Sequence, residues 1–159
     1  MSVNNKLDDI DRNILAILQE NGRITNAELA SRIGISPPSM LERVKKLEKK
    51  GVIRRYVALV DPSMVDKGTM ALVSVSLDRH RVKSIDQFTR AIEKLPEVME
   101  CYHVTGEEDY ILKVVVKDIQ EYENLILTKL TKLPALSKLK TSFILSTVKY
   151  QTSYPIEEL

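Results

Sequence analysis

The side chains best suited to chemistry in this sequence are the basic ones between Arg43 and Arg55. Residues 1–60 hold 11 Lys and Arg against 7 Asp and Glu, whereas residues 61–159 hold 13 against 15. A positive charge concentrated in one part of a chain favours contact with a polyanion in that part alone. Lysines that merely solvate a helix face would give the same distribution, so charge by itself leaves both interpretations open.

A second group of polar residues lies in the stretch Thr105-Gly106-Glu107-Glu108-Asp109. Gly106 permits a tight turn, and backbone amides beside such a turn can hold a carboxylate. Glu107 or Asp109 can hold an ammonium group. An amino acid carries both groups and would fit such a turn, whereas a solvated turn whose acids have no specific role is the alternative.

The basic residues need a scaffold, and the sequence predicts three helices around them. Apolar residues at helical spacing predict a first helix over residues 8–20. Thr25 and Glu28 have the spacing of a capping box, which predicts a short second helix over residues 26–33. Gly34 supplies the tight exit that a helix-turn-helix requires before its next helix.

The third predicted helix carries most of the basic residues. Ser36 and Pro37 suit its start, and Gly51 suits its end. An apolar stripe turns inward, so the opposite side is expected to enter the major groove of DNA. The residues we expect to contact DNA are Asn26, Ser36, Pro38, Ser39, Leu41, Glu42, Arg43, Lys45, Lys46 and Lys49.

These candidates suit different parts of a duplex. Glu42 can accept a hydrogen bond from a cytosine amino group, and Leu41 can meet a thymine methyl group. The lysines suit phosphates, while Arg43 either reaches a phosphate or pairs with Glu42. Since no outward Arg or Asn dominates the set, we expect modest sequence specificity, with DNA shape and multivalent binding supplying the rest.

The second half of the chain repeats a strand–helix–strand unit, and both of its helices end at the sequence Lys-Leu-Pro. Two such units in tandem predict a ferredoxin-like βαββαβ domain, in which two helices cover one face of an antiparallel sheet. The predicted strands are residues 70–77, 98–104, 110–116 and 141–150.

The expected architecture is therefore α+β, with two domains. A further strand predicted over residues 52–60 makes the N-terminal helix-turn-helix domain winged-helix-like. The expected divisions are a helix-turn-helix domain at 1–60, a linker at 61–69 and a ferredoxin-like effector-binding and oligomerisation domain at 70–159.

One strand indicates how the sheet is covered. Along residues 110–116, every second residue from Tyr110 onward is expected to face the helices, which leaves Ile111, Lys113 and Val115 on the other face. That mixed face is too apolar to lie open to water. We therefore expect it to pack on a second copy of the domain.

These stretches together resemble the Lrp/AsnC family of leucine-responsive and asparagine regulators, and most of all its leucine-responsive branch. The resemblance runs from about Leu7 to Tyr150. The matching motifs are Leu7-Asp8-Asp9-Ile10-Asp11-Arg12-Asn13-Ile14-Leu15, Asn21-Gly22-Arg23, Gly34-Ile35-Ser36-Pro37, Glu42-Arg43-Val44, Leu47-Glu48, Gly51-Val52-Ile53, Glu100-Cys101, Val104-Thr105-Gly106 and Asp109-Tyr110-Ile111-Leu112-Lys113.

The resemblance implies a transcription regulator that binds double-stranded DNA and responds to a small effector, such as leucine or a similar amino acid. It also implies dimers that assemble into tetramers or octamers and bend or wrap DNA. The implied effector pocket lies between subunits near the hairpin of residues 105–109. The residues implied to bind the effector are Tyr102, His103, Val104, Thr105, Gly106, Glu107 and Asp109.

Other classes of function receive less support. No apolar run approaches the about 18 residues that span a membrane, and the single cysteine suits a reducing cytoplasm. His80 and His103 lack ligand spacing for a metal, and no catalytic constellation or cofactor motif is present. The alternatives are a broad DNA-organising protein of the nucleoid type that ignores small molecules and, more remotely, an enzyme on the ferredoxin-like domain.

Overall fold

The computed structural model describes residues 7–78 and 83–156, so His80 and the polar start of the chain lie outside the described residues. Close contacts divide the chain into a helical unit, residues 1–59 and 149–159, and a sheet unit, residues 60–148. The sequence analysis assigned everything after residue 69 to the second domain. The grouping of the C-terminal segment with the helices differs from that assignment.

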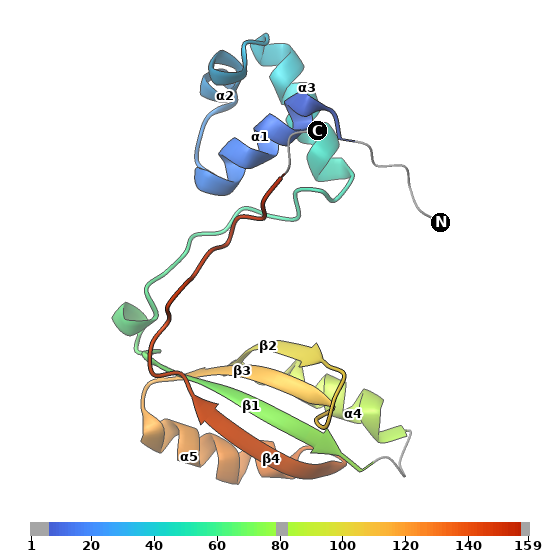
Figure 1. Ribbon diagram of the computed structural model, residues 1–159, viewed down its shortest axis with the longest axis vertical. Helices are drawn as coiled ribbons and strands as arrows, with labels where there is room; N and C mark the ends of the chain where they lie inside the picture. The colour runs from blue at the N-terminus through green and yellow to red at the C-terminus, as the bar shows by residue number, and fades with distance from the viewer. Residues whose placement is uncertain (1–6, 79–82, 157–159) are drawn as a thin grey trace. The chain divides into compact units, whose positions relative to one another are not determined.

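The helical unit contains α1 (Asp9–Glu20), α2 (Asn26–Ile33) and α3 (Pro37–Lys49), as Figure 1 shows. All three begin close to their predicted starts, where Asp8, Thr25 and Ser36 serve as the capping residues. Apolar residues from all three helices meet in one small core. Its buried members are Ile14, Leu15, Leu29, Ala30, Met40, Val44 and Leu47.

Local signals fix the turn between α2 and α3. The Thr25 side chain accepts from the backbone N–H of Glu28, and the Glu28 carboxylate accepts from the N–H of Thr25, which completes the predicted capping box. Gly34 ends α2 with a φ of 82°, a left-handed conformation that side chains with a Cβ rarely adopt. The Ser36 hydroxyl then caps α3. The helix-turn-helix prediction is confirmed.

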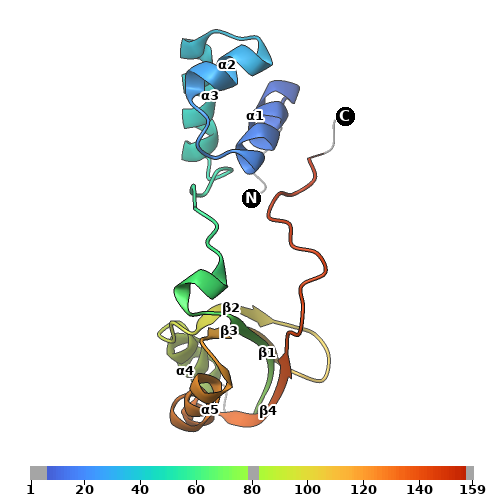
Figure 2. The same cartoon turned by 90° about the vertical axis from the view of Figure 1, so that its left-hand side faces the viewer.

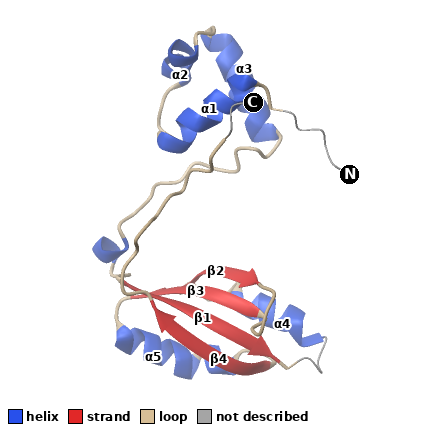
Figure 3. Ribbon diagram, in the orientation of Figure 1, coloured by secondary structure: helices blue, strands red, loops and turns tan. Residues whose placement is uncertain are grey.

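The sheet unit has the predicted βαββαβ order (Figure 3). Its strands lie in the order β2-β3-β1-β4, with every paired neighbour antiparallel. Short 3-10 turns lie at Pro62–Val65 and Leu130–Lys132. The other elements are β1 (Thr69–Leu77), α4 (Lys83–Ile92), β2 (Val98–His103), β3 (Tyr110–Val116), α5 (Ile119–Thr128) and β4 (Leu136–Phe143).

The two faces of the sheet differ in burial. In Figure 2 the helices α4 and α5 cover one face, against which alternate residues of β1 and β3 pack. The buried residues there include Val73, Leu112, Val114 and Phe88. The other face carries Leu72, which is 40% exposed, beside the partly buried Ile111 and Lys113. The alternation predicted for residues 110–116 is confirmed from Tyr110 to Val114, whereas Val115, on the other face, is buried as well.

Two strand predictions were wrong. Residues 52–60 form no strand, and none of the strands in the described residues pairs with them. The last strand spans Leu136–Phe143 rather than residues 141–150. It pairs with β1 from Leu136 to Phe143, and Ile144 makes the final backbone bond, to Met70. Beyond that point β1 has ended, so the apolar residues that follow have no strand to pair with.

Within the described residues, no helix is long and apolar enough to cross a membrane.

Candidate functional site

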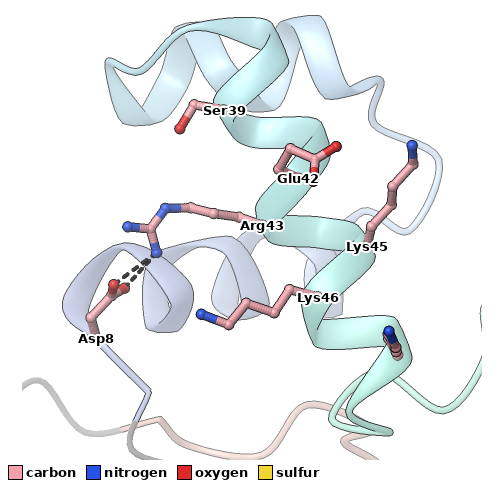
Figure 4. A pocket seen from close by; sticks show the side chains of 7 residues that line it. Asp8, Ser39, Glu42, Arg43, Lys45 and Lys46 are labelled. Carbon is pink, nitrogen blue, oxygen red and sulfur yellow. Dashed lines mark hydrogen bonds and ion pairs between the residues drawn. The ribbon is translucent and has the colours of Figure 1, made fainter.

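The exposed side of α3 forms an open, mostly basic surface, which we call the α3 surface. Met40, Val44 and Leu47 are buried in the helical core, and this fixes which residues of α3 face outward. A hollow of about 530 Å³ lies over the outward side (Figure 4). It is lined by Asp8, Ser39, Glu42, Arg43, Lys45, Lys46 and Lys49.

Arg43 is held by two carboxylates of α1. Its Nη1 lies 2.7 Å from Asp8 Oδ2 and 2.7 Å from Asp11 Oδ1, as ion pairs between two helices. The Asp8 pair is drawn with dashed lines in Figure 4. The sequence analysis left Arg43 either contacting a phosphate or pairing with Glu42. In the structure Arg43 pairs instead with the carboxylates of Asp8 and Asp11.

The two charges stabilise one another. The Asp11 backbone N–H donates to Asp8, and this bond, together with the Arg43 side chain, lowers the pKa of the Asp8 carboxyl. Bonds to Asp8 and Asp11 raise the pKa of Arg43. Because the Asp8 pKa is depressed on folding, its stabilising effect is present above its ordinary pKa and is lost as pH falls through the folded value. Asp8 therefore both caps α1 and fastens α3 to it.

The other predicted DNA contacts lie at several different places on α2 and α3. Ser39, Glu42, Lys45, Lys46 and Lys49 lie together at the hollow with exposed side chains. Pro38 and Leu41 are also exposed on α3 but do not line the hollow. The Ser36 hydroxyl accepts from the Ser39 N–H at 3.4 Å, so it serves as a cap. Asn26 is half-buried at the first position of α2.

The segment after α3 is anchored at Tyr56. Its hydroxyl donates to Glu48 at 3.0 Å, and its ring lies beside Gly22, at the turn after α1. Burial and the Glu48 carboxylate raise the pKa of Tyr56 to about 12, so the phenol stays protonated at neutral pH. The exposed Arg54 and Arg55 lie just before this anchor.

The second candidate site, the hairpin of residues 105–109, is tied to β1 by Asp109. The Val104 N–H donates to the Asp109 carbonyl at 3.0 Å across the hairpin. The Asp109 N–H donates to the Val75 carbonyl at 2.9 Å, and Asp109 Oδ2 accepts from the Leu77 N–H at 2.8 Å. Asp109 therefore holds the hairpin in place, whereas Glu107 at its tip is exposed.

The predicted effector residues do not all face the same way. Tyr102 pairs with Ile111 and so lies on the outer face of the sheet. His103 pairs with Tyr110 on the helix-covered face and stacks on its ring at 4.9 Å between centroids. Adjacent strand residues point to opposite faces. Tyr102 and His103 therefore point to opposite faces of the sheet, whereas Thr105, Gly106 and Glu107 are exposed together at the tip.

Both halves of the chain match known domain families. Residues 7–54 match the winged helix-turn-helix DNA-binding model, and residues 70–154 match the Lrp/AsnC ligand binding domain. The chain belongs to the Lrp/AsnC family. This Lrp/AsnC protein is a DNA-binding transcription regulator with a ligand-binding domain, as the resemblance implied.

Individual relatives agree along nearly the whole chain. The leucine-responsive regulatory protein of Escherichia coli K12 is 42% identical over 143 residues, which are 90% of this chain and 87% of that one. A transcriptional regulator from Neisseria meningitidis, solved as an L-methionine complex, is 37% identical with a TM-score of 0.90. That match covers 94% of this chain and 97% of the other. AsnC of E. coli is 27% identical with a TM-score of 0.87, covering 94% and 99%.

Replacing Arg43 with Met should leave the salt dependence of DNA binding unchanged, because the Arg43 guanidinium is already paired with two carboxylates, those of Asp8 and Asp11. Replacing Lys46 with Met should lower the slope of log Kd against log salt concentration by about 0.9 for each phosphate that is no longer neutralised. The two variants are matched, since each removes one positive charge. Fluorescence anisotropy with a labelled duplex at several salt concentrations measures the slope. An equal fall in both variants would assign Arg43 to a phosphate.

Replacing Asp109 with Ala should lower the free energy of unfolding by about 1–3 kcal/mol, because the Leu77 N–H is left without its acceptor. Replacing the exposed Glu107 with Ala should change it by no more than about 0.5 kcal/mol. Urea unfolding of both variants makes the comparison. Equal stabilities would mean that Asp109 does not hold the hairpin. If the expected difference is found, Glu107 is the better position at which to test ligand binding.

Proposed function

We propose that this protein is a cytosolic regulator that inserts α3 into the major groove and whose oligomer and DNA affinity respond to an amino acid. The observation that carries the proposal is one chain with an exposed basic helix-turn-helix surface and a ligand-binding domain of the Lrp/AsnC type. The relatives it matches are transcription regulators rather than enzymes.

The chemistry of α3 supports a contact dominated by phosphates. Lys45, Lys46 and Lys49 are exposed, and each can neutralise one phosphate. Ser39 and Glu42 lie in the N-terminal half of α3, the part of a recognition helix that contacts base edges. Glu42 accepts hydrogen bonds and therefore favours cytosine, whose amino group donates in the major groove.

The hairpin chemistry supports a zwitterionic effector. Gly106 has a φ of 132°, a conformation that side chains with a Cβ rarely adopt, and backbone amides beside such a glycine turn can hold a carboxylate. A carboxylate at these amides and an ammonium near Glu107 would engage both ends of an amino acid. The relative from N. meningitidis was solved with L-methionine, and the curated relatives are named for leucine. We therefore propose leucine or methionine as the first candidates.

The outer face of the sheet supports self-association. Leu72 is 40% exposed, and the partly buried, apolar Ile111 shares its face. A second copy that packs on this face would remove it from water, and a two-fold axis would place the same residues on both sides. A pocket between copies would also let Tyr102 of one chain and the hairpin of another contact one ligand. We propose such dimers as the unit that builds tetramers or octamers.

One observation favours a second candidate function, a broad DNA-organising protein without an effector. Arg is the residue most often used to contact guanine, and the single arginine of α3 is paired with Asp8 and Asp11. A surface of lysines binds DNA with little preference for sequence. The response to amino acids distinguishes the two candidates.

A panel of the twenty amino acids should raise the melting temperature with one or a few members, leucine and methionine first, because a ligand that binds only the folded state stabilises it. Replacing Glu107 with Gln should remove most of that shift, since the ammonium is left without its charged partner. Replacing the adjacent Glu108 with Gln removes the same charge and serves as the control. A panel without any shift would favour the DNA-organising function.

Replacing Leu72 with Glu should reduce the molar mass in sedimentation equilibrium, because two copies would each place a carboxylate in an apolar contact. Replacing Leu127 with Glu, at an exposed position on α5, is the matched control. A Leu72→Glu protein that keeps the mass of the unaltered protein would mean that the outer face of the sheet is not the interface.

A further inference from the structure

The C-terminal segment, residues 149–156, is part of the helical unit although the whole sheet unit separates it from the helices in sequence. One side chain of α1 holds its backbone on both sides. The Tyr154 N–H donates to Gln19 Oε1 at 2.7 Å, and the Tyr154 carbonyl accepts from Gln19 Nε2 at 3.1 Å. Two residues later, the half-buried Ile156 packs against the helical core.

We propose that this C-terminal segment is a detachable strap, through which the sheet unit controls α1 and so the DNA-binding helix. The chain passes from the helical unit into the sheet unit once and returns once. The return passage begins at the end of β4, which is bonded along its length to β1. In this proposal a change in the position of β4 is passed to the strap through residues 144–148, which join them along the chain. The proposal rests on the proposed function, because it assigns the cause of that change to an effector.

Helix α1 connects the strap to α3. Gln19, in the last turn of α1, holds the strap, and Asp8 and Asp11 at the start of α1 hold Arg43 of α3. The helix between them is a rigid element of twelve residues. Strap, α1 and α3 thus form a continuous series of polar contacts, in which a shift at one end has a physical route to the other.

The strap is held weakly enough to be released. The strap is attached by two hydrogen bonds to the half-buried Gln19 side chain and by the half-buried Ile156. These contacts oppose the gain in conformational entropy that the strap residues would make on release. Tyr150 and Tyr154 are 69% and 80% exposed, so their rings add little burial. Bound and released forms are then close in free energy, and a modest change at β4 is sufficient to shift their populations.

The test uses the full chain with the substitutions Gln19→Met and Ile156→Asn, singly and together. Asn13→Met is the matched control, because Asn13 is an exposed amide residue on α1. L-Leucine and L-methionine are the probes. Three quantities are measured for each protein: the melting-temperature shift with each probe, the Kd for a labelled duplex with and without it, and hydrogen exchange of the C-terminal peptide.

If the strap conveys the signal, Gln19→Met keeps the melting-temperature shift but no longer shows the change in Kd that the probe causes. Its C-terminal peptide exchanges faster, and the double variant is no worse than either single one, because both break the same attachment. A purely structural weakening would instead make the two effects additive. A probe-induced change in Kd that is equal in Gln19→Met and Asn13→Met overturns the proposal.

The same experiment distinguishes a failure of the strap proposal from a failure of the proposed amino-acid effector. If neither probe shifts the melting temperature of the unaltered protein, the amino-acid effector fails, and the strap is judged on DNA binding alone. Gln19→Met, which removes both hydrogen bonds to the Tyr154 backbone, should then still weaken DNA binding on the order of fivefold. The salt slope should stay unchanged, since every phosphate contact is kept. An unaltered Kd in Gln19→Met would reject the strap in that case.

Discussion

The pairing of Arg43 with Asp8 and Asp11 decides how the DNA-binding helix is presented. The apolar core supplies most of the stability of the helical unit, because each buried Val, Leu, Ile or Met side chain contributes about 1.5–3 kcal/mol, and six of the seven buried core residues are of these types. A partly exposed ion pair contributes only about 0.2–1 kcal/mol. Its importance is therefore geometric. Together with the burial of Met40, Val44 and Leu47, it sets which side of α3 faces outward at the level where the lysines begin.

The same pair relieves a conflict on α3. A helix that binds phosphates gathers cations on one side, and those cations repel one another in the absence of DNA. Arg43, Lys45, Lys46 and Lys49 all lie on this side, with Glu42 as the carboxylate of α3 among them. The two α1 carboxylates offset part of the repulsion from outside the helix. The lysines are left free for phosphates, while the arginine is used for structure.

Short-range signals made most of the fold predictable. The Thr25–Glu28 capping box, Gly34 and the Ser36–Pro37 start each act within a few residues, so the sequence contains all of their chemistry. The errors arose where residues distant in the sequence decide the structure. The segment 141–150 has the composition of a strand, yet pairing stops at Ile144 because β1 ends there. Similarly, Asp11 and Gln19 look like ordinary helix residues, and their partners lie 32 and 135 positions away.

The weakness of α3 as a base-contacting helix explains why the protein needs its second unit. Three lysines per chain give an affinity that depends strongly on salt and little on sequence. Several such surfaces held at fixed spacing bind far more tightly and only where sites recur at that spacing. In the proposed assembly, specificity resides in the geometry of the copies, and a ligand that alters this geometry changes DNA binding without touching a single α3 residue. Because the proposed contact between copies lies on the ligand-binding domain, that one domain would both hold the ligand and set the geometry.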